Sequence, residues 1–149
     1  MYEIPKIQVS IVVHLVNEES IPGSVFVTED LVSPGGNPEV EDYLNLDPDK
    51  FFSFRSDAGA YRLINKSHVV YIETDQTDEE ASAQTPLEPR SLVVHFTNAI
   101  TLYGVVYPTL AEEARVSDIL NAEGNFMTLY RQGRKLIVNL DKVVYVNAN

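Results

Sequence analysis

Two histidines, His14 and His95, occupy the same place in two similar stretches and are the first candidates for chemistry. An imidazole can bind a metal ion or act as a general base near neutral pH. A metal site needs several converging ligands, and the third histidine, His68, has no counterpart in the second stretch. We therefore expect both histidines on the polar face of a strand, and we predict no catalytic residue and no metal ligand.

A carboxylate paired with an amide is the second candidate, in an Asp-x-Leu-Asn unit that occurs twice. The residues concerned are Asp42, Asn45, Asp118 and Asn121. Such a pair could face a ligand. It could equally cap a short helix, because an acid suits the positive end of the helix dipole and asparagine tolerates the left-handed conformation at a helix end. We favour capping and retain all four as candidate ligand or interface contacts.

Two further groups complete the candidate ligand or interface contacts. Asn65 and Asn139 each precede a final strand and are expected to hold a tight turn through bonds between side chain and backbone. The basic cluster of Arg131, Arg134 and Lys135 could bind a phosphate or a carboxylate, or stand in solvent at a hairpin tip. It could also meet the acidic part of a neighbouring molecule in a head-to-tail assembly.

No cofactor is predicted. Gly35 and Gly36 lack the Lys-Ser/Thr that completes a phosphate-binding loop, and the chain has no Gly-x-Ser-x-Gly elbow. The absence of cysteine excludes disulfides, thiolate metal ligands and a cysteine nucleophile. A nucleophile, a base and an orienting group therefore cannot be assembled from these residues.

The candidate residues recur because the chain contains two copies of one sequence unit. The matches keep one order: 9–15 with 90–96, Gly23 with Gly104, 40–45 with 116–121, Asn65 with Asn139, and 69–71 with 143–145. We predict a first copy over 1–73, an acidic flexible linker over 74–89 and a second copy over 90–149. The linker has little to bury and carries several like charges.

The composition is typical of a small packed protein. The chain has 149 residues, 44% of them hydrophobic, and no apolar run of the roughly 18–20 residues that a membrane span needs. Its first residues lack the basic-then-apolar layout of a secretory signal, so we expect a cytoplasmic protein without membrane contact. Lys and Arg number 11 against 22 Asp and Glu, and the net charge of -11 argues against broad, charge-driven binding of nucleic acid.

Alternation and turn signals predict five strands and one short helix in each copy. Residues 7–16 place apolar side chains on one face and polar ones on the other, as a half-buried strand does. Gly23 and Gly104 lie inside the second strands, where glycine marks a bulge, a bend or a close backbone approach. Short helices are expected over about 38–45 and 112–121. The predicted fold is mainly β: two tandem small five-stranded β-barrels, Sm-like or SH3-like, each with one short helix between its second and third strands.

Several stretches resemble the Sm-like family of Sm, LSm and bacterial Hfq proteins. Residues 91–106 are similar to the first two strands of an Sm-like barrel, and 138–146 have the spacing of the second Sm motif, which 64–69 repeat. The resemblance implies a small barrel and RNA binding. The Arg-Gly pair that helps bind RNA in the family is replaced here by Asn65-Lys66 and Asn139-Leu140. With its added helix, the chain looks like an uncharacterised bacterial domain family.

We expect a non-enzymatic module for protein interaction or self-assembly. Its partner would be another protein or a second copy of the chain, and we expect a homo-oligomer, because the exposed final strand of a small barrel invites pairing. RNA or nucleotide binding through the Sm-like barrels is the alternative, and an uncharacterised enzyme is the second alternative. The net charge and the replaced Arg-Gly pairs argue against nucleic acid as a partner.

Overall fold

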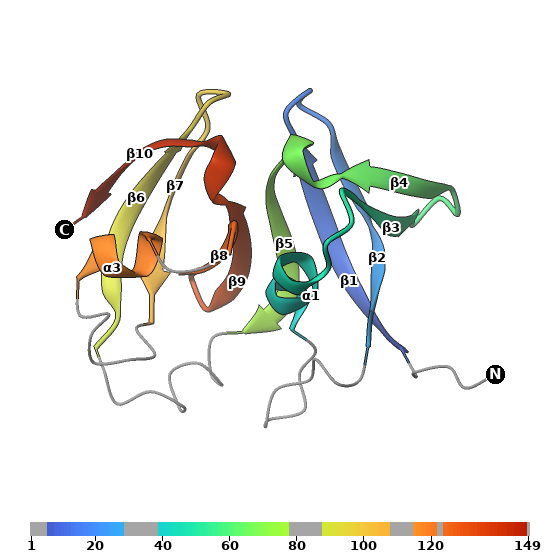
Figure 1. Cartoon of the computed structure of the whole chain (residues 1–149), viewed down its shortest axis with the longest axis horizontal. Helices are drawn as coiled ribbons and strands as arrows, with labels where there is room; N and C mark the ends of the chain where they lie inside the picture. Colours follow the sequence, from blue (N-terminus) through green and yellow to red (C-terminus); the bar gives the residue numbers. More distant parts are fainter. Residues whose placement is uncertain (1–5, 29–38, 78–87, 108–114, 122–123, 149) are drawn as a thin grey trace.

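Strands form most of the described chain, so the prediction of a mainly β protein is confirmed. The computed structural model describes residues 6–28, 39–77, 88–107, 115–121 and 124–148 (Figure 1). The first half contains β1 (Lys6–Leu15), β2 (Ser20–Thr28), α1 (Val40–Leu46), β3 (Phe51–Ser56), β4 (Tyr61–Asn65), the 3-10 turn η2 (Lys66–His68) and β5 (Val69–Thr77). The second half contains β6 (Arg90–Phe96), β7 (Thr101–Val106), α3 (Val116–Leu120), β8 (Phe126–Arg131), β9 (Arg134–Asn139), the 3-10 turn η4 (Leu140–Lys142) and β10 (Val143–Ala148).

The ten strands in the described part of the chain belong to one antiparallel sheet with the order β10-β6-β7-β8-β9-β5-β1-β2-β3-β4. Each half contributes five neighbouring strands, and the fifth strand of each half lies beside its first. The sheet is open, so the prediction of two separate closed barrels is not confirmed. The physical reason is that the free edge of β5 pairs with β9 from the second half and is not available to close the first half. The strands β4 and β10 end the sheet at opposite sides of the molecule (Figure 1).

The predicted boundaries shift at the helices and at the linker. The helices begin at Val40 and Val116, later than expected, while residues 38 and 112–114 lie outside the described residues. The strand β5 continues to Thr77, which pairs with Arg134, so the first residues of the predicted linker are strand because β9 supplies their backbone partners. Residues 78–87 of the linker also lie outside the described part. Within that part, no helix is long and apolar enough to cross a membrane.

Two glycines permit the sharp turn of the sheet from the second strand of each half to the third. A Cβ atom at Gly23 would collide with the carbonyl oxygen of Arg55 and the ring of Phe54. A Cβ atom at Gly104 would collide with the carbonyl oxygen of Tyr130. The close backbone approach that was one of the predicted roles of these glycines is therefore confirmed.

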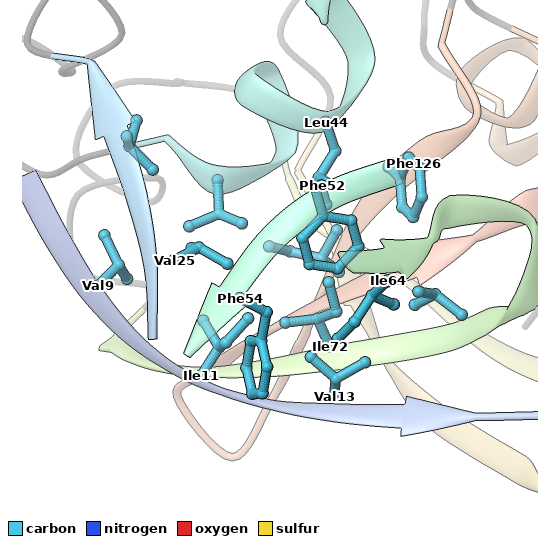
Figure 2. Close-up of a cluster of buried hydrophobic side chains, with 14 residues drawn as sticks. Val9, Ile11, Val13, Val25, Leu44, Phe52, Phe54, Ile64, Ile72 and Phe126 are labelled. Atoms are coloured by element: carbon cyan, nitrogen blue, oxygen red, sulfur yellow. The ribbon is translucent and has the colours of Figure 1, made fainter. Parts of the chain in front are cut away.

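The hydrophobic core forms two clusters, and both cross from one half to the other. The first cluster contains the buried side chains of β1, β2, α1 and β3, together with Phe126 and Ile137 from the second half. Figure 2 shows Phe126 beside Leu44 and Phe52. The second cluster in turn takes Val70 and Tyr71 from the first half. The halves therefore share their cores and do not fold around independent ones.

Candidate functional site

The contact between the halves is the best-formed interface in the described chain. We call it the inner seam: β5 and α1 of the first half against β8 and β9 of the second. In its backbone register Tyr71 lies opposite Val138, and Ile72 lies opposite Ile137. Because Ile72 and Ile137 are both fully buried, the inner seam is an extension of the core and not a surface contact.

Asn45 connects α1 to β8 through both ends of its amide. Its Nδ2 donates to the carbonyl oxygen of Phe126 at 3.0 Å, and its Oδ1 accepts from the backbone nitrogen of Phe126 at 2.9 Å. The equivalent residue of the second half, Asn121, instead donates to the carbonyl oxygen of Ser117 within its own helix, at 2.8 Å. Asn45 lies in the last turn of α1, whose C-cap is Asp47, and Asn121 is the C-cap of α3 with a φ of -95°, so neither forms the left-handed cap that was predicted. Asn45 differs from Asn121 in having a strand from the other half beside it.

Asn139 and Asn65 hold equivalent turns, as predicted for both. The Oδ1 of Asn139 accepts from the backbone nitrogen of Asp141 at 3.1 Å, and the Oδ1 of Asn65 accepts from that of Ser67 at 3.0 Å. Asn139 has a second role that sequence reasoning missed. Its Nδ2 donates across the inner seam to the carbonyl oxygens of Lys66 and Val69, at 3.2 and 2.8 Å. A side chain expected to serve only its own turn therefore also fixes the contact between the halves.

A hollow of about 590 Å³ lies where the end of α1 meets the turns η2 and η4. It brings together three of the predicted residues, Asn45, Asn65 and Asn139. The Nζ of Lys66, which also lines it, donates to the carbonyl oxygens of Leu44 and Asp47 at 3.2 and 2.7 Å. The polar groups of Asn45, Asn139 and Lys66 thus bind protein backbone across this hollow, and we assign it to the inner seam.

The predicted basic cluster is divided by the structure. The Nζ of Lys135 turns toward α1 and is 2.9 Å from a carboxylate oxygen of Glu39 and 2.8 Å from one of Glu41. Arg131 lies over the ring of Tyr103, 4.6 Å from its centroid, while Arg134 is exposed at the β8–β9 hairpin. Arg131 and Arg134 lie opposite each other in the register of β8 and β9, whereas Lys135, the next residue of β9, points to the other face, so the three cations do not form one surface patch.

Burial and charge set the protonation of this charged cluster. Burial raises the pKa of Glu41 to about 8, and the hydrogen bond and charge of Glu39 act in the same direction. Burial lowers the pKa of Lys135, but the neighbouring Glu41 and Glu39 outweigh that effect and raise the pKa of the ammonium overall. The surroundings therefore favour the charged form of Lys135 and shift Glu41 toward its protonated form. The hydroxyl of Thr128 donates to the other oxygen of Glu41 at 2.7 Å.

The two predicted aspartates have different surroundings. Burial raises the pKa of Asp42, with a further contribution from the charge of Glu39. Asp118 lies on the surface, where Arg115 donates to it at 3.2 Å and lowers its pKa. Both lie in the first turn of their helices, the position expected for an acid that suits the helix dipole.

The two histidines stack on tyrosines of the neighbouring strand. The rings of His14 and Tyr71 are 4.2 Å apart, and those of His95 and Tyr145 are 4.1 Å apart. His14 also bonds the hydroxyl of Ser20 at 2.8 Å. Among the described residues, the acidic group that includes Glu39 and Glu41 is spatially close enough to suggest a cation, and there Lys135 already supplies the positive charge.

Glu41 should make the protein less stable as the pH rises. Its pKa is raised from the ordinary 4.5 to about 8 in the folded chain, so the fold retains a proton that the unfolded chain releases. The associated stabilisation is complete below the unfolded pKa and is lost as the pH rises through the folded one. The free energy of unfolding should fall by at most about 1.4 kcal/mol per pH unit from this one group. Urea unfolding at a series of pH values should show this fall in the wild type and a flatter profile in Glu41→Gln. Parallel profiles would contradict the assignment.

The two ends of the sheet expose the strands that correspond to those of the inner seam. By the sequence repeat, β4 corresponds to β9, and β10 corresponds to β5. Ile137 of β9 is 0% exposed whereas Leu63 of β4 is 61% exposed. Val70 of β5 is 0% exposed whereas Val144 of β10 is 61% exposed. In the described part of the chain, β4 pairs only with β3 and β10 only with β6, so each offers one unpaired edge.

The chain was compared with protein-family models, with curated proteins and with solved structures, and none of them matches. Function is therefore inferred from the inner seam, the charged cluster and the two open edges.

Proposed function

We propose that the protein is a non-enzymatic self-assembly module whose chains join head to tail, with β4 of one chain pairing with β10 of the next. In this proposal each half is a small barrel-like unit, and contacts within and between chains follow one geometry. The observation that carries the proposal is the inner seam, in which strands corresponding to β4 and β10 already pair. We call the proposed contact between chains the outer seam.

The inner seam supplies a backbone register for the outer one. Transferring its pairs by the sequence repeat places Tyr145 opposite Ile64, and Val146 opposite Leu63. Phe51 would then be covered as Phe126 is within the chain; their present exposures are 48% and 7%. An unpaired edge with apolar side chains is a template for pairing with another chain. The outer seam would cover β4 and β10 in the way that the inner seam covers their counterparts, β9 and β5.

The polar contacts transfer as well. The Oδ1 of Asn65 accepts from Ser67, and its Nδ2 would donate to the carbonyl oxygens of Leu140 and Val143 in the next chain, as Asn139 does to Lys66 and Val69. Asn121 would turn from its own helix to the backbone of Phe51, as Asn45 does to Phe126. Both asparagines therefore gain at the outer seam the role that their counterparts already have at the inner one.

Assembly should be visible as a solution mass well above the 16.7 kDa of one chain. Because the two joining surfaces differ, such a contact closes into a ring or continues as a filament, and sedimentation over a concentration range distinguishes these forms. Leu63→Lys should reduce the mass to that of one chain, because it places a charge in the middle of the outer seam. Leu46→Lys is the matched control, since Leu46 is also an exposed leucine, on α1 and not at a sheet edge. A wild-type chain that sediments as a monomer would contradict the proposal.

A further inference from the structure

The inner seam and the proposed outer seam differ most in their charged residues. At the inner seam, Lys135 faces Glu39 and Glu41, and its side chain is buried. The sequence repeat places Tyr61 at the position of Lys135, Arg115 at that of Glu39 and Ser117 at that of Glu41. The sequence repeat therefore conserves the strands of the two seams but not the charges at these three positions.

We propose that the cluster of Lys135, Glu39 and Glu41 is a specificity determinant that restricts β9 to β5 and thereby directs β4 to β10 of another chain. This inference rests on the self-assembly proposed above and identifies the occupant of each edge. The occupant of the β10 edge is β4 of a second copy of this chain. Along the assembly, each first half would consequently be followed by a second half, and each second half by a first half.

In the two proposed pairings, β5 with β9 and β4 with β10, the residues at the positions of the charged cluster have suitable partners. Lys135 has two carboxylates within 3 Å at the inner seam, and Thr128 donates to Glu41 on its other side. On the β4 edge the hydroxyls of Tyr61 and Ser53 lie 2.8 Å apart and satisfy each other without a charged partner. Arg115 pairs with Asp118 at the start of α3, and in the described part of the chain the positions that correspond to Glu39 and Glu41 hold Arg115 and Ser117, neither of which is a carboxylate.

The two alternative pairings, β4 with β5 and β9 with β10, would separate Lys135 from Glu39 and Glu41. If β4 paired with β5, Tyr61 would face Glu39 and Glu41 and would not supply the positive charge that Lys135 supplies at the inner seam. If β9 paired with β10, Lys135 would face Arg115 in place of two carboxylates. An uncompensated charge in a buried contact is strongly unfavourable. Each edge therefore accepts one partner strand and rejects the other on electrostatic grounds.

Cysteine pairs can report which strands meet, because the chain has no cysteine of its own. The transferred register places position 62 of β4 opposite position 147 of β10 at the outer seam, and opposite position 73 of β5 in the mismatched one. A chain with Arg62→Cys is mixed with a chain carrying either Asn147→Cys or Glu73→Cys. Each mixture is refolded together from urea and oxidised, and mass spectrometry counts the disulfides. In the wild-type background we expect the 62–147 link to exceed the 62–73 link by roughly tenfold or more.

Exchanging the two determinant residues should reverse the preference. In the double variant Tyr61→Lys with Lys135→Tyr, β4 carries the cation that fits α1, so the 62–73 link should become the more abundant one. A second background, Lys135→Met with Glu39→Gln and Glu41→Gln, leaves no unpaired charge when folded and should lower the ratio of the two links at least about threefold.

The possible failures are distinguishable. A wild-type mixture that forms no 62–147 link and sediments as a monomer overturns self-assembly and this inference together. A mixture that forms the 62–147 link, with a ratio that neither variant background changes, overturns the specificity role alone. Circular dichroism on each background confirms that the compared chains are folded.

Discussion

Lys135→Ala should destabilise the folded chain by about 3 kcal/mol, because it removes the cation that bonds two mostly buried carboxyl groups. Glu39 and Glu41 both bond the Nζ of Lys135, and their side chains are mostly buried. Burial favours the protonated form of Glu41, so the charge that Lys135 neutralises is mainly that of Glu39. The loss is measured as the free energy of unfolding in urea. A Leu63→Lys background keeps assembly from adding to the measured stability.

Two companion variants show whether the charge is responsible. Arg134→Ala, one residue earlier on β9 and exposed, should change the stability by no more than about 0.5 kcal/mol. Adding Glu39→Gln and Glu41→Gln to Lys135→Met should restore most of the loss, because an apolar replacement of a buried ion pair is often neutral. A loss under about 1 kcal/mol in Lys135→Ala would place the pair among weak surface bridges and remove its specificity role.

Phe126→Ala should cost about 3–5 kcal/mol, the range for removing a large aromatic side chain from a core. Phe126 begins β8 in the second half but lies in the core cluster of the first, beside Leu44 (Figure 2). Its truncation therefore removes apolar contacts of both halves and leaves a cavity at the inner seam. The measurement is the unfolding free energy in the same Leu63→Lys background, where the two halves should still unfold in one transition.

Phe51→Ala is the matched control for this variant. Phe51 is the counterpart of Phe126 by the sequence repeat but is half exposed at the β4 edge. Its truncation should change the stability of a single chain by less than about 1 kcal/mol. In an otherwise wild-type chain it should lower the assembled mass, because Phe51 would be covered at the outer seam. Equal losses of stability at the two positions would show that the inner seam does not bury Phe126 as described.

Local sequence patterns were sufficient to predict the strands and turns. Period-two alternation identifies β1 and its counterpart β6, because burial of one face requires apolar residues at every second position. Asn65 and Asn139 could be recognised as turn residues because their bonds reach only two residues along the chain. Gly23 and Gly104 were recognisable as special positions because glycine inside a strand marks a bulge, a bend or a close backbone approach, and the structure shows the last of these.

Only the tertiary structure decided which edges and charges meet. Alternation states which face of a strand is buried but not which strand lies beside it, so the pairing of β5 with β9 could not be predicted, and two closed barrels were predicted in place of one open sheet. The partners of Lys135 are 94 and 96 residues away, whereas the cation next to it in the sequence, Arg134, is exposed and points to the other face of the strand. Asn45 likewise reaches Phe126 across 81 residues. Contacts of this kind depend on the three-dimensional course of the chain, and residue type and spacing carry no signal for them.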